Sequence, residues 1–298
     1  MRNPRLFLPA ASGHEGSSIA VAEFLRFRDF FYRHTGIFFA ENKRYYVDRR
    51  LESRMAAIGS PSFQAYFALL LADSGGEEMK QLVSRFTINE TYFYREEHQF
   101  RCLSRNLLPD IVATKRRDRP IRIWSVPCST GEEPYSIAIW LLENWPEVDL
   151  HEIEIVGSDI DAEALRLAEA GLYGPRALAR LPPGVLARYF EPATEGGRRL
   201  VPALRDSVQF TRANLVDAAQ MARYRGFDIV FCRNLLIYFD DASRRLAVEN
   251  IYDCLAPGGY VCLGHSESMS RISSLFTIRR FPDAIVYQKQ EQARGEGG

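Results

Sequence analysis

The chain has 298 residues, and 38 lysines and arginines balance 38 aspartates and glutamates. Hydrophobic residues make up 46% and charged residues 26%, a globular composition that excludes disordered, collagen-like and coiled-coil proteins. Zero net charge argues against a strongly basic nucleic-acid-binding protein. Five scattered cysteines without a C-x-x-C pair argue against a disulfide framework or a zinc site. No apolar run approaches the ~20 residues that span a bilayer, so we expect a cytoplasmic protein that is not inserted into a membrane.

The first third of the chain has helical periodicity only. Residues 1–16 have no period and predict a loose leader. Residues 17–75 predict an N-terminal helical domain, with one helix that starts at Ser17 or Ser18 and ends before Gly36, and further helices at 42–58 and 62–72. A fourth helix at 77–86 lies in a predicted helical linker, 76–89.

Residues 90–290 predict an α/β domain. Strands are expected at 121–126, 153–157, 208–211, 227–232 and 260–263, with helices at 135–144, 161–170 and 241–255. This alternation predicts a doubly wound, mostly parallel sheet, and the β-rich runs 276–280 and 285–288 predict a closing antiparallel hairpin. Residues 174–207, rich in Pro, Gly and Arg, break the alternation and predict an insertion, and 291–298 form a tail.

Charge is divided along the chain although the total is zero. Residues 128–170 contain eleven acidic side chains and one basic side chain. Helix 42–58 and the insertion 174–207 are predominantly basic. The sequence therefore predicts one acidic surface and at least two basic ones.

Two acidic segments follow predicted strands, where open α/β sheets bind their ligands. Cys128–Ser136 reads CSTGEEPYS, and its two glutamates suit a positively charged ligand or merely complement the dipole of the following helix. In Gly157–Asp161 (GSDID), Asp159 is the candidate for binding two ribose hydroxyls, whereas Asp161 is better explained as a helix N-cap.

Two further segments place polar residues near the sheet. Phe227–Asp240 runs from a buried strand into Arg233 and Asn234, whose alternative roles are a surface ion pair and a local turn. Phe86–Arg95 (FTINETYFYR) ends on an arginine whose planar fork suits a carboxylate. Its Asn89 or Thr91 could instead cap a helix that continues to Leu103.

Together these segments resemble the CheR family of chemotaxis receptor methyltransferases. The motifs TINETYFYR, CSTGEEPYSIA, DIDAEAL, FCRNLLIYFD and LAPGGYVCLGHSES follow the family's order and spacing from about Ala20 to Lys289. The resemblance implies an S-adenosylmethionine-dependent methyltransferase sheet with an N-terminal all-helical domain and a small β-subdomain inserted at 174–207. It also implies methylation of receptor glutamates to γ-methyl esters, with S-adenosylhomocysteine as product.

The resemblance also implies roles for individual residues at the reacting end of the cofactor. Asn89, Thr91 and Arg95 would border it, with Arg95 near the reacting centre. Tyr238 would lie near the transferred methyl, and Glu132 rather than its neighbour would face the methionine part.

At the nucleoside end, the resemblance implies that Asp159 holds the ribose hydroxyls and that Asn214 and Leu215 lie beside the adenine. Three residues would line the pocket largely through their main chain: Cys232, Arg233 and Asn234. No metal is expected, because an ionised glutamate needs neither a metal nor a general base to attack a sulfonium methyl.

Partners follow from the same resemblance. Lys43, Arg50 and Arg54 of helix 42–58 would dock on acidic receptor helices, whereas a solvated charged face is the alternative. The insertion 174–207 is a candidate site for a receptor-tail peptide, and we expect a monomer that binds no nucleic acid. Two other functions stay open: a nucleic-acid amino-methyltransferase, for which Asn234 is suitably placed, and a non-catalytic S-adenosylmethionine-binding signalling module.

Overall fold

The computed structural model describes residues 19–73, 76–193, 196–269 and 272–290. It divides into two compact units, residues 1–34 with 39–79, and residues 35–38 with 80–298. The predicted leader, tail and first helix cap lie outside the described residues. Within those residues, no helix is both long and apolar enough to cross a membrane.

The first unit is helical. It holds most of α1 (Val21–Thr35), the short η1 (Glu41–Lys43), α2 (Arg44–Ala57), α3 (Phe63–Ala72) and the start of α4 (Glu77–Phe86). Apolar residues at helical spacing are buried on the α-helices of this unit, as with Phe24, Phe27 and Phe31 of α1. Ser62 caps α3 by accepting a hydrogen bond from the amide of Ala65.

An internal ion pair changes the expectation for helix α2. The Arg54 guanidinium donates to both carboxylate oxygens of Glu78, at 2.7 and 2.6 Å, and Tyr66 donates to the same carboxylate at 2.6 Å. The Arg54 side chain is only 15% exposed. Its grouping with Lys43 and Arg50 on one docking face is therefore wrong, because its charge is neutralised inside the helical unit.

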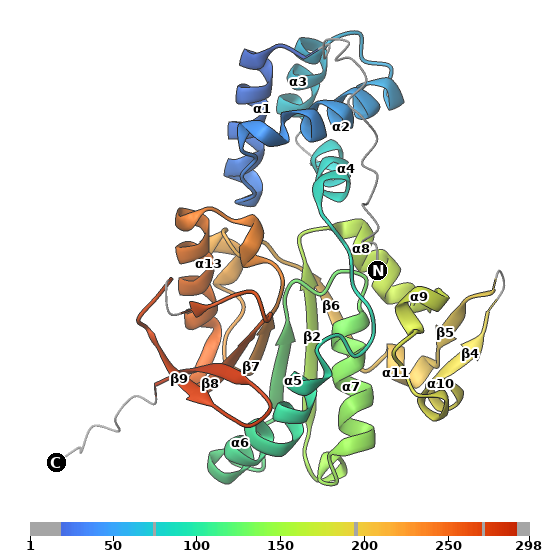
Figure 1. Ribbon diagram of the computed structural model, residues 1–298, viewed down its shortest axis with the longest axis vertical. Coiled ribbons are helices and arrows are strands. Elements are labelled where there is room, and N and C mark those ends of the chain that lie inside the picture. Colours follow the sequence, from blue (N-terminus) through green and yellow to red (C-terminus); the bar gives the residue numbers. More distant parts are fainter. Residues whose placement is uncertain (1–18, 74–75, 194–195, 270–271, 291–298) are drawn as a thin grey trace, which may run out of the picture. The chain divides into compact units, whose positions relative to one another are not determined.

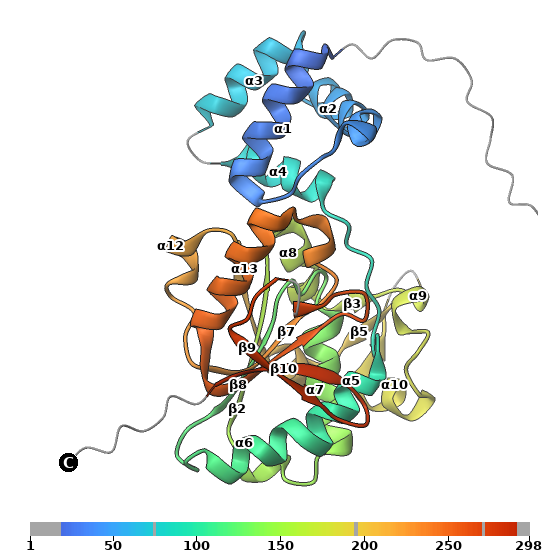
Figure 2. The same cartoon turned by 60° about the vertical axis from the view of Figure 1, so that its left-hand side comes forward.

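The second unit is built on a seven-stranded sheet of order β6-β2-β1-β7-β8-β10-β9. Its strands are β1 (Ile121–Ser125), β2 (Ile153–Asp159), β6 (Val208–Arg212), β7 (Phe227–Cys232), β8 (Leu255–Leu263), β9 (Phe276–Arg280) and β10 (Ile285–Lys289). The first five strands in this order are parallel, and β10 pairs antiparallel with β8 and β9 (Figure 2). The predicted doubly wound sheet with a closing hairpin is confirmed.

Helices cover both faces of this sheet (Figure 1). On one face lie α5 (Glu97–Cys102), the π-helix η2 (Leu103–Leu107), α6 (Leu108–Thr114) and α7 (Glu132–Asn144). On the other lie α12 (Ala218–Met221) and α13 (Asp241–Cys254), while α8 (Ala162–Ala170) follows β2. Helix α5 begins only at Glu97, so neither Asn89 nor Thr91 caps it. That alternative for the two residues is wrong.

The insertion forms a small antiparallel sheet of order β3-β5-β4. Its strands are β3 (Leu172–Tyr173), β4 (Phe190–Pro192) and β5 (Arg198–Leu200), and its helices are α9 (Pro175–Leu178), α10 (Pro183–Tyr189) and α11 (Pro202–Arg205). Each helix starts with a proline, which needs no hydrogen-bond partner at that position. The sheet starts two residues before the predicted boundary at 174, because β3 pairs with β5.

Candidate cofactor and methyl-transfer site

A pocket opens where β1 and β7 end and the 88–95 segment crosses them. Its lining comprises Ile88, Glu90, Thr91, Tyr92, Arg95, Phe100, Pro127, Cys128, Ser129, Glu133, Arg233 and Asn234. Four residues singled out from sequence thus meet here: Thr91, Arg95, Arg233 and Asn234. Arg233 and Asn234 reach the pocket because β7 ends beside β1 in the parallel sheet, and the 88–95 segment brings Thr91 and Arg95 to the same place.

Backbone strain is concentrated around this pocket. In the described ranges, four residues other than glycine have φ between 49° and 60°: Tyr94, Glu96, Ser129 and Asn234. Each belongs to a segment that forms the pocket wall. A left-handed conformation is costly for such residues and is typical of functional sites.

Asp159 ends β2 as a buried carboxylate, only 3% exposed. Its two oxygens accept hydrogen bonds from the amides of Ser129 and Asp161, at 2.8 and 2.9 Å. No ion pair links it to any cation among the described residues, and burial raises its pKa to about 6. Asp161 caps α8 through the amides of Glu163 and Ala164, as predicted.

Asn89 joins the 88–95 segment to the end of β2. Its amide donates to Asp161 at 2.8 Å, as does the hydroxyl of Thr87, and its carbonyl oxygen accepts from the Ser129 hydroxyl at 3.3 Å. The side chain therefore positions the loop after β1, and its predicted contact with the cofactor stays a prediction.

The two glutamates of the loop after β1 have different environments. Gly131, at φ 92°, lets the chain turn into α7, where a Cβ would lie 2.8 Å from Ala168. Glu133 accepts from Ser125 and forms a 2.8 Å ion pair with Arg233. Glu132 is buried, accepts from Thr130 at 2.7 Å, and has no ion-pair partner in the described chain. Burial raises the pKa of Glu132.

Arg233 is an internal connector. It is 4% exposed, donates to the carbonyl oxygen of Arg95 at 2.7 Å, and lies 3.4 Å from Glu96 in addition to its pair with Glu133. The surface ion pair considered from sequence is wrong, because Arg233 connects three segments inside the domain. Although burial alone would raise the pKa of Glu96, Arg233 and His265 hold it below its ordinary value.

Glu267 is a site residue that sequence reasoning missed. Its carboxylate accepts from the amides of Asn234 and Leu236, both at 2.7 Å, and of Gly264 at 2.9 Å. It thereby fixes the loop after β7 to the loop after β8. The available signal was the polar HSES run after a buried strand, but its partner is 33 residues away.

Arg95 and Tyr238 are the two predicted catalytic residues. The Arg95 guanidinium donates to the carbonyl oxygen of Glu90 at 2.8 Å and lies beside the Tyr92 ring. Tyr238 ends the short helix η5 (Leu236–Tyr238) and is 38% exposed. Burial raises the pKa of Tyr238, and the charge of Arg95 opposes that rise, so the two side chains are electrostatically coupled.

Seven of the predicted site residues lie outside the pocket lining: Asn89, Glu132, Asp159 and Tyr238, described above, and Asn214, Leu215 and Cys232. Asn214 and Leu215 follow β6 and are buried, and the carbonyl oxygen of Leu215 accepts from Asn250 at 2.7 Å. Cys232 ends β7 fully buried, and burial raises the pKa of its thiol. Their contacts with a cofactor stay predictions.

This parallel sheet and these strand-end acids define the class of S-adenosylmethionine-dependent methyltransferases. The family model described as "CheR methyltransferase, SAM binding domain" matches residues 89–285, and the model of the CheR all-alpha domain matches residues 22–87. The chain belongs to the CheR methyltransferase family, and its cofactor is S-adenosylmethionine.

Curated relatives match over nearly their whole length. "Chemotaxis protein methyltransferase 2" of Vibrio cholerae serotype O1 is 47% identical, with 93% of this chain and 96% of that protein covered. "Chemotaxis protein methyltransferase" of Escherichia coli K12 is 35% identical, with 89% and 91% covered. A methyltransferase structure from Mesorhizobium loti overlaps at a TM-score of only 0.28 and 18% identity, covering 52% of this chain and 51% of that one.

Proposed function

We propose that this enzyme methylates glutamate side chains of chemoreceptors to γ-methyl esters, as an adaptation enzyme of chemotaxis. The curated relatives are named chemotaxis protein methyltransferases, which supports the pathway. The structural observation that carries the proposal is a pair of buried acids near the pocket, Asp159 and Glu132, without ion-pair partners among the described residues.

These acids fit S-adenosylmethionine chemically. A buried carboxylate is costly unless hydrogen-bond donors or a cation satisfy it. Each carboxylate oxygen of Asp159 accepts a hydrogen bond from one backbone amide and can accept another. Two ribose hydroxyls would suit this remaining capacity. Glu132 suits the cofactor's ammonium, because Glu133 is already neutralised by Arg233.

The substrate carboxylate requires positioning rather than activation. A glutamate is ionised at neutral pH, so no general base is needed. When bound, the cofactor would supply a sulfonium methyl: a carbon–oxygen bond to the glutamate would form, the carbon–sulfur bond would break, and its electron pair would stay on sulfur. Arg95 would orient the incoming carboxylate with Tyr238 beside it, and alignment of this kind can contribute about 7 to 11 kcal/mol.

Receptor docking is proposed for Lys43, which ends η1, and for the partly exposed Arg50 of helix α2. Lys43 is exposed, and Arg50 stacks its guanidinium 3.4 Å from the centre of the Tyr46 ring. A cationic surface of this kind favours acidic receptor helices. Arg54 supports the helical unit instead.

Three finer features also belong to this proposal. The insertion would take an extended receptor-tail peptide along an edge of its small antiparallel sheet. All five cysteines are free and buried, which supports a reducing cytoplasm. The protein would act as a monomer, which size-exclusion chromatography with light scattering would check.

The decisive experiment is methyl transfer to receptor fragments. Labelled S-adenosylmethionine is incubated with the enzyme and receptor cytoplasmic fragments, and esters are detected by alkaline release of methanol. We expect label in receptors and none when the acceptor glutamates are changed to glutamine. Label in RNA or DNA instead would support the nucleic-acid alternative, and cofactor binding without any transfer would support the non-catalytic one.

A further inference from the structure

Arg95, the residue proposed to orient the substrate carboxylate, lies between two residues of strained backbone. Tyr94 and Glu96 have φ of 58° and 55°, a left-handed conformation that is costly for residues other than glycine. Such a conformation persists only where the surrounding structure holds it. The contacts of the chain on each side of Arg95 therefore determine where its side chain is directed.

The chain before Arg95 is attached to helix α7. The amide of Tyr94 donates to the Ser136 hydroxyl at 3.0 Å, and the Tyr94 ring packs edge-on against Trp140 of the same helix. The carbonyl oxygen of Arg95 itself accepts from Arg233, the residue after β7, at 2.7 Å. The backbone of Arg95 is thus fixed to α7 on one side and to the end of β7 on the other.

Beyond Arg95, several segments meet at the Glu96 carboxylate. One oxygen accepts from the Gln99 side chain at 2.8 Å and lies 3.4 Å from the Arg233 guanidinium, and the other accepts from the His265 ring at 3.1 Å. The Glu96 side chain is only 11% exposed, so these contacts are largely shielded from water. Glu96 thereby joins the chain after Arg95 to residues that follow β7 and β8.

Gln99 extends this attachment to the sheet itself. The same side-chain amide donates to the carbonyl oxygen of Leu263, the last residue of β8, at 2.7 Å. The backbone amide of Gln99 donates to the carbonyl oxygen of Glu96 at 2.9 Å. The start of α5 is therefore tied to the carboxyl end of β8, at the edge of the sheet where the pocket opens.

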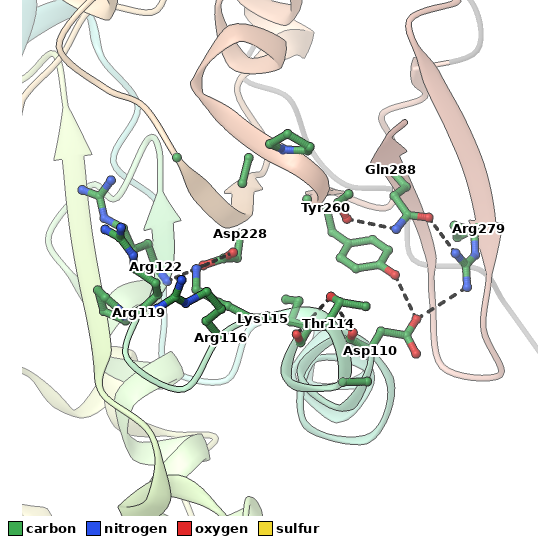
Figure 3. Close-up of a pocket in the computed structure, with 18 residues that line it drawn as sticks. Asp110, Thr114, Lys115, Arg116, Arg119, Arg122, Asp228, Tyr260, Arg279 and Gln288 are labelled. Atoms are coloured by element: carbon green, nitrogen blue, oxygen red, sulfur yellow. Dashed lines mark hydrogen bonds and ion pairs between the residues drawn. The ribbon is translucent and has the colours of Figure 1, made fainter. Parts of the chain in front are cut away.

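The far end of the same helical segment is anchored near the opposite edge of the sheet (Figure 3). Helices α5, η2 and α6 follow one another without a break over residues 97–114. Asp110 of α6 accepts from the Tyr260 hydroxyl of β8 at 2.9 Å, and Lys115, directly after α6, contacts Asp228 of β7 at 2.7 and 2.6 Å. With both ends attached to the sheet, the segment forms a fixed base for the chain that precedes it.

We propose that Glu96 is a positioning residue for methyl transfer, which directs Arg95 toward the substrate carboxylate. This inference rests on the function proposed above. Within the described residues the Arg95 guanidinium makes a single hydrogen bond, to the carbonyl oxygen of Glu90, so its direction depends on the backbone of Arg95. Loss of the carboxylate would let Glu96 leave its left-handed conformation and would turn Arg95 out of place.

The test compares methyl transfer to receptor fragments with calorimetric binding of S-adenosylmethionine, both in the full-length protein. Glu96→Ala should lower kcat about 10-fold to 100-fold with cofactor affinity nearly unchanged, since a displacement of about 1 Å can cost about 100-fold. Glu96→Gln retains one acceptor oxygen and should recover part of the rate. Glu97→Ala is the matched control and should leave kcat unchanged, because the neighbouring Glu97 side chain is 49% exposed and pairs with Arg101 on the surface of α5.

A glycine at position 96 separates the carboxylate from the backbone. Glycine adopts positive φ without steric cost, so Glu96→Gly relieves the strain but removes the acceptor for Gln99 and His265. We expect this variant to be as slow as Glu96→Ala. Amide hydrogen exchange over residues 92–96, measured without receptor, should be faster in both variants than in the wild type.

Three results would overturn the proposal. The first is wild-type kcat in Glu96→Ala. The second is full activity in Glu96→Gly, which would assign the effect to the backbone conformation and not to the carboxylate. The third is unchanged exchange over residues 92–96 in Glu96→Ala, which would show that the carboxylate does not hold this segment. A wild-type enzyme that leaves receptor fragments unmethylated would contradict the proposed function instead, and the exchange measurement would still test the positioning.

Discussion

Asp159 shows how one buried carboxylate tests the cofactor assignment. Among the described residues it accepts from two amides and pairs with no cation, and we propose that ligand hydroxyls use its remaining acceptor capacity. Asp159→Asn should weaken S-adenosylmethionine binding about 10-fold to 100-fold, since hydrogen bonds to a charged group contribute about 1.5 to 3 kcal/mol. Isothermal titration calorimetry measures this directly. Full-strength binding by the variant would remove Asp159 from the ribose site.

The raised pKa of Asp159, about 6, predicts a pH dependence. Below that pKa the side chain is neutral, and above it the carboxylate accepts hydroxyl hydrogens, so cofactor affinity should fall as pH falls through about 6. At pH 5 the loss should be about tenfold. In Asp159→Asn, cofactor affinity should fall less steeply as pH falls. Part of the fall should remain, because the pKa of Glu132 is also raised. A flat wild-type profile from pH 5 to 7.5 would contradict the prediction.

Arg95 and Tyr238 should affect turnover more than cofactor binding. Arg95→Ala removes the fork proposed to hold the substrate carboxylate, and we expect kcat to fall about 10-fold to 1000-fold. Tyr238→Phe should also lower kcat, but by a smaller factor than Arg95→Ala. Steady-state kinetics paired with calorimetry separates the roles: a large loss of cofactor affinity with unchanged kcat would assign both residues to cofactor binding instead.

At the scale of elements, Glu267 connects the loops after β7 and β8. Glu267→Ala leaves the amides of Asn234, Leu236 and Gly264 without their acceptor. Since η5 carries Tyr238, we expect kcat to fall and amide hydrogen exchange over residues 234–238 to speed up. Glu267→Gln retains one acceptor oxygen and should recover part of both. Lost activity with unchanged exchange would show that Glu267 does not position this loop.

At the scale of the whole molecule, the zero net charge is the sum of an acidic region around the proposed cofactor site and separate basic surfaces. Arg50 and Arg54 lie one turn apart on α2, but only Arg54 is paired inside the helical unit, so their substitutions should have different effects. Arg50→Glu should slow receptor methylation at low salt and matter less at high salt, because screening weakens docking. Arg54→Ala should instead lower the free energy of unfolding, by about 3 to 5 kcal/mol, since it leaves the buried Glu78 carboxylate without its cation. Denaturant titration distinguishes them, with the exposed Arg49→Ala as control, and equal effects on docking would contradict the assignment.

The sequence by itself determined the succession of strands and helices along the chain, but not the order of the strands within the sheet. Strands 227–232 and 276–280 and helix 77–86 have the predicted bounds, and Asp161 caps its helix as expected. Hydrophobic periodicity, turn residues and capping are local properties, so they are readable along the chain. The motifs likewise predicted the family, because their order and spacing are written in the sequence.

Only the tertiary structure decided which charges neutralise one another. Arg233 pairs with Glu133 across 100 residues, and Arg54 pairs with Glu78 across 24. Glu267 acquires its role only because β7 and β8 are neighbours in the sheet. Such contacts depend on strand order and packing, and the energy of a charge depends on its burial, neither of which a local pattern records.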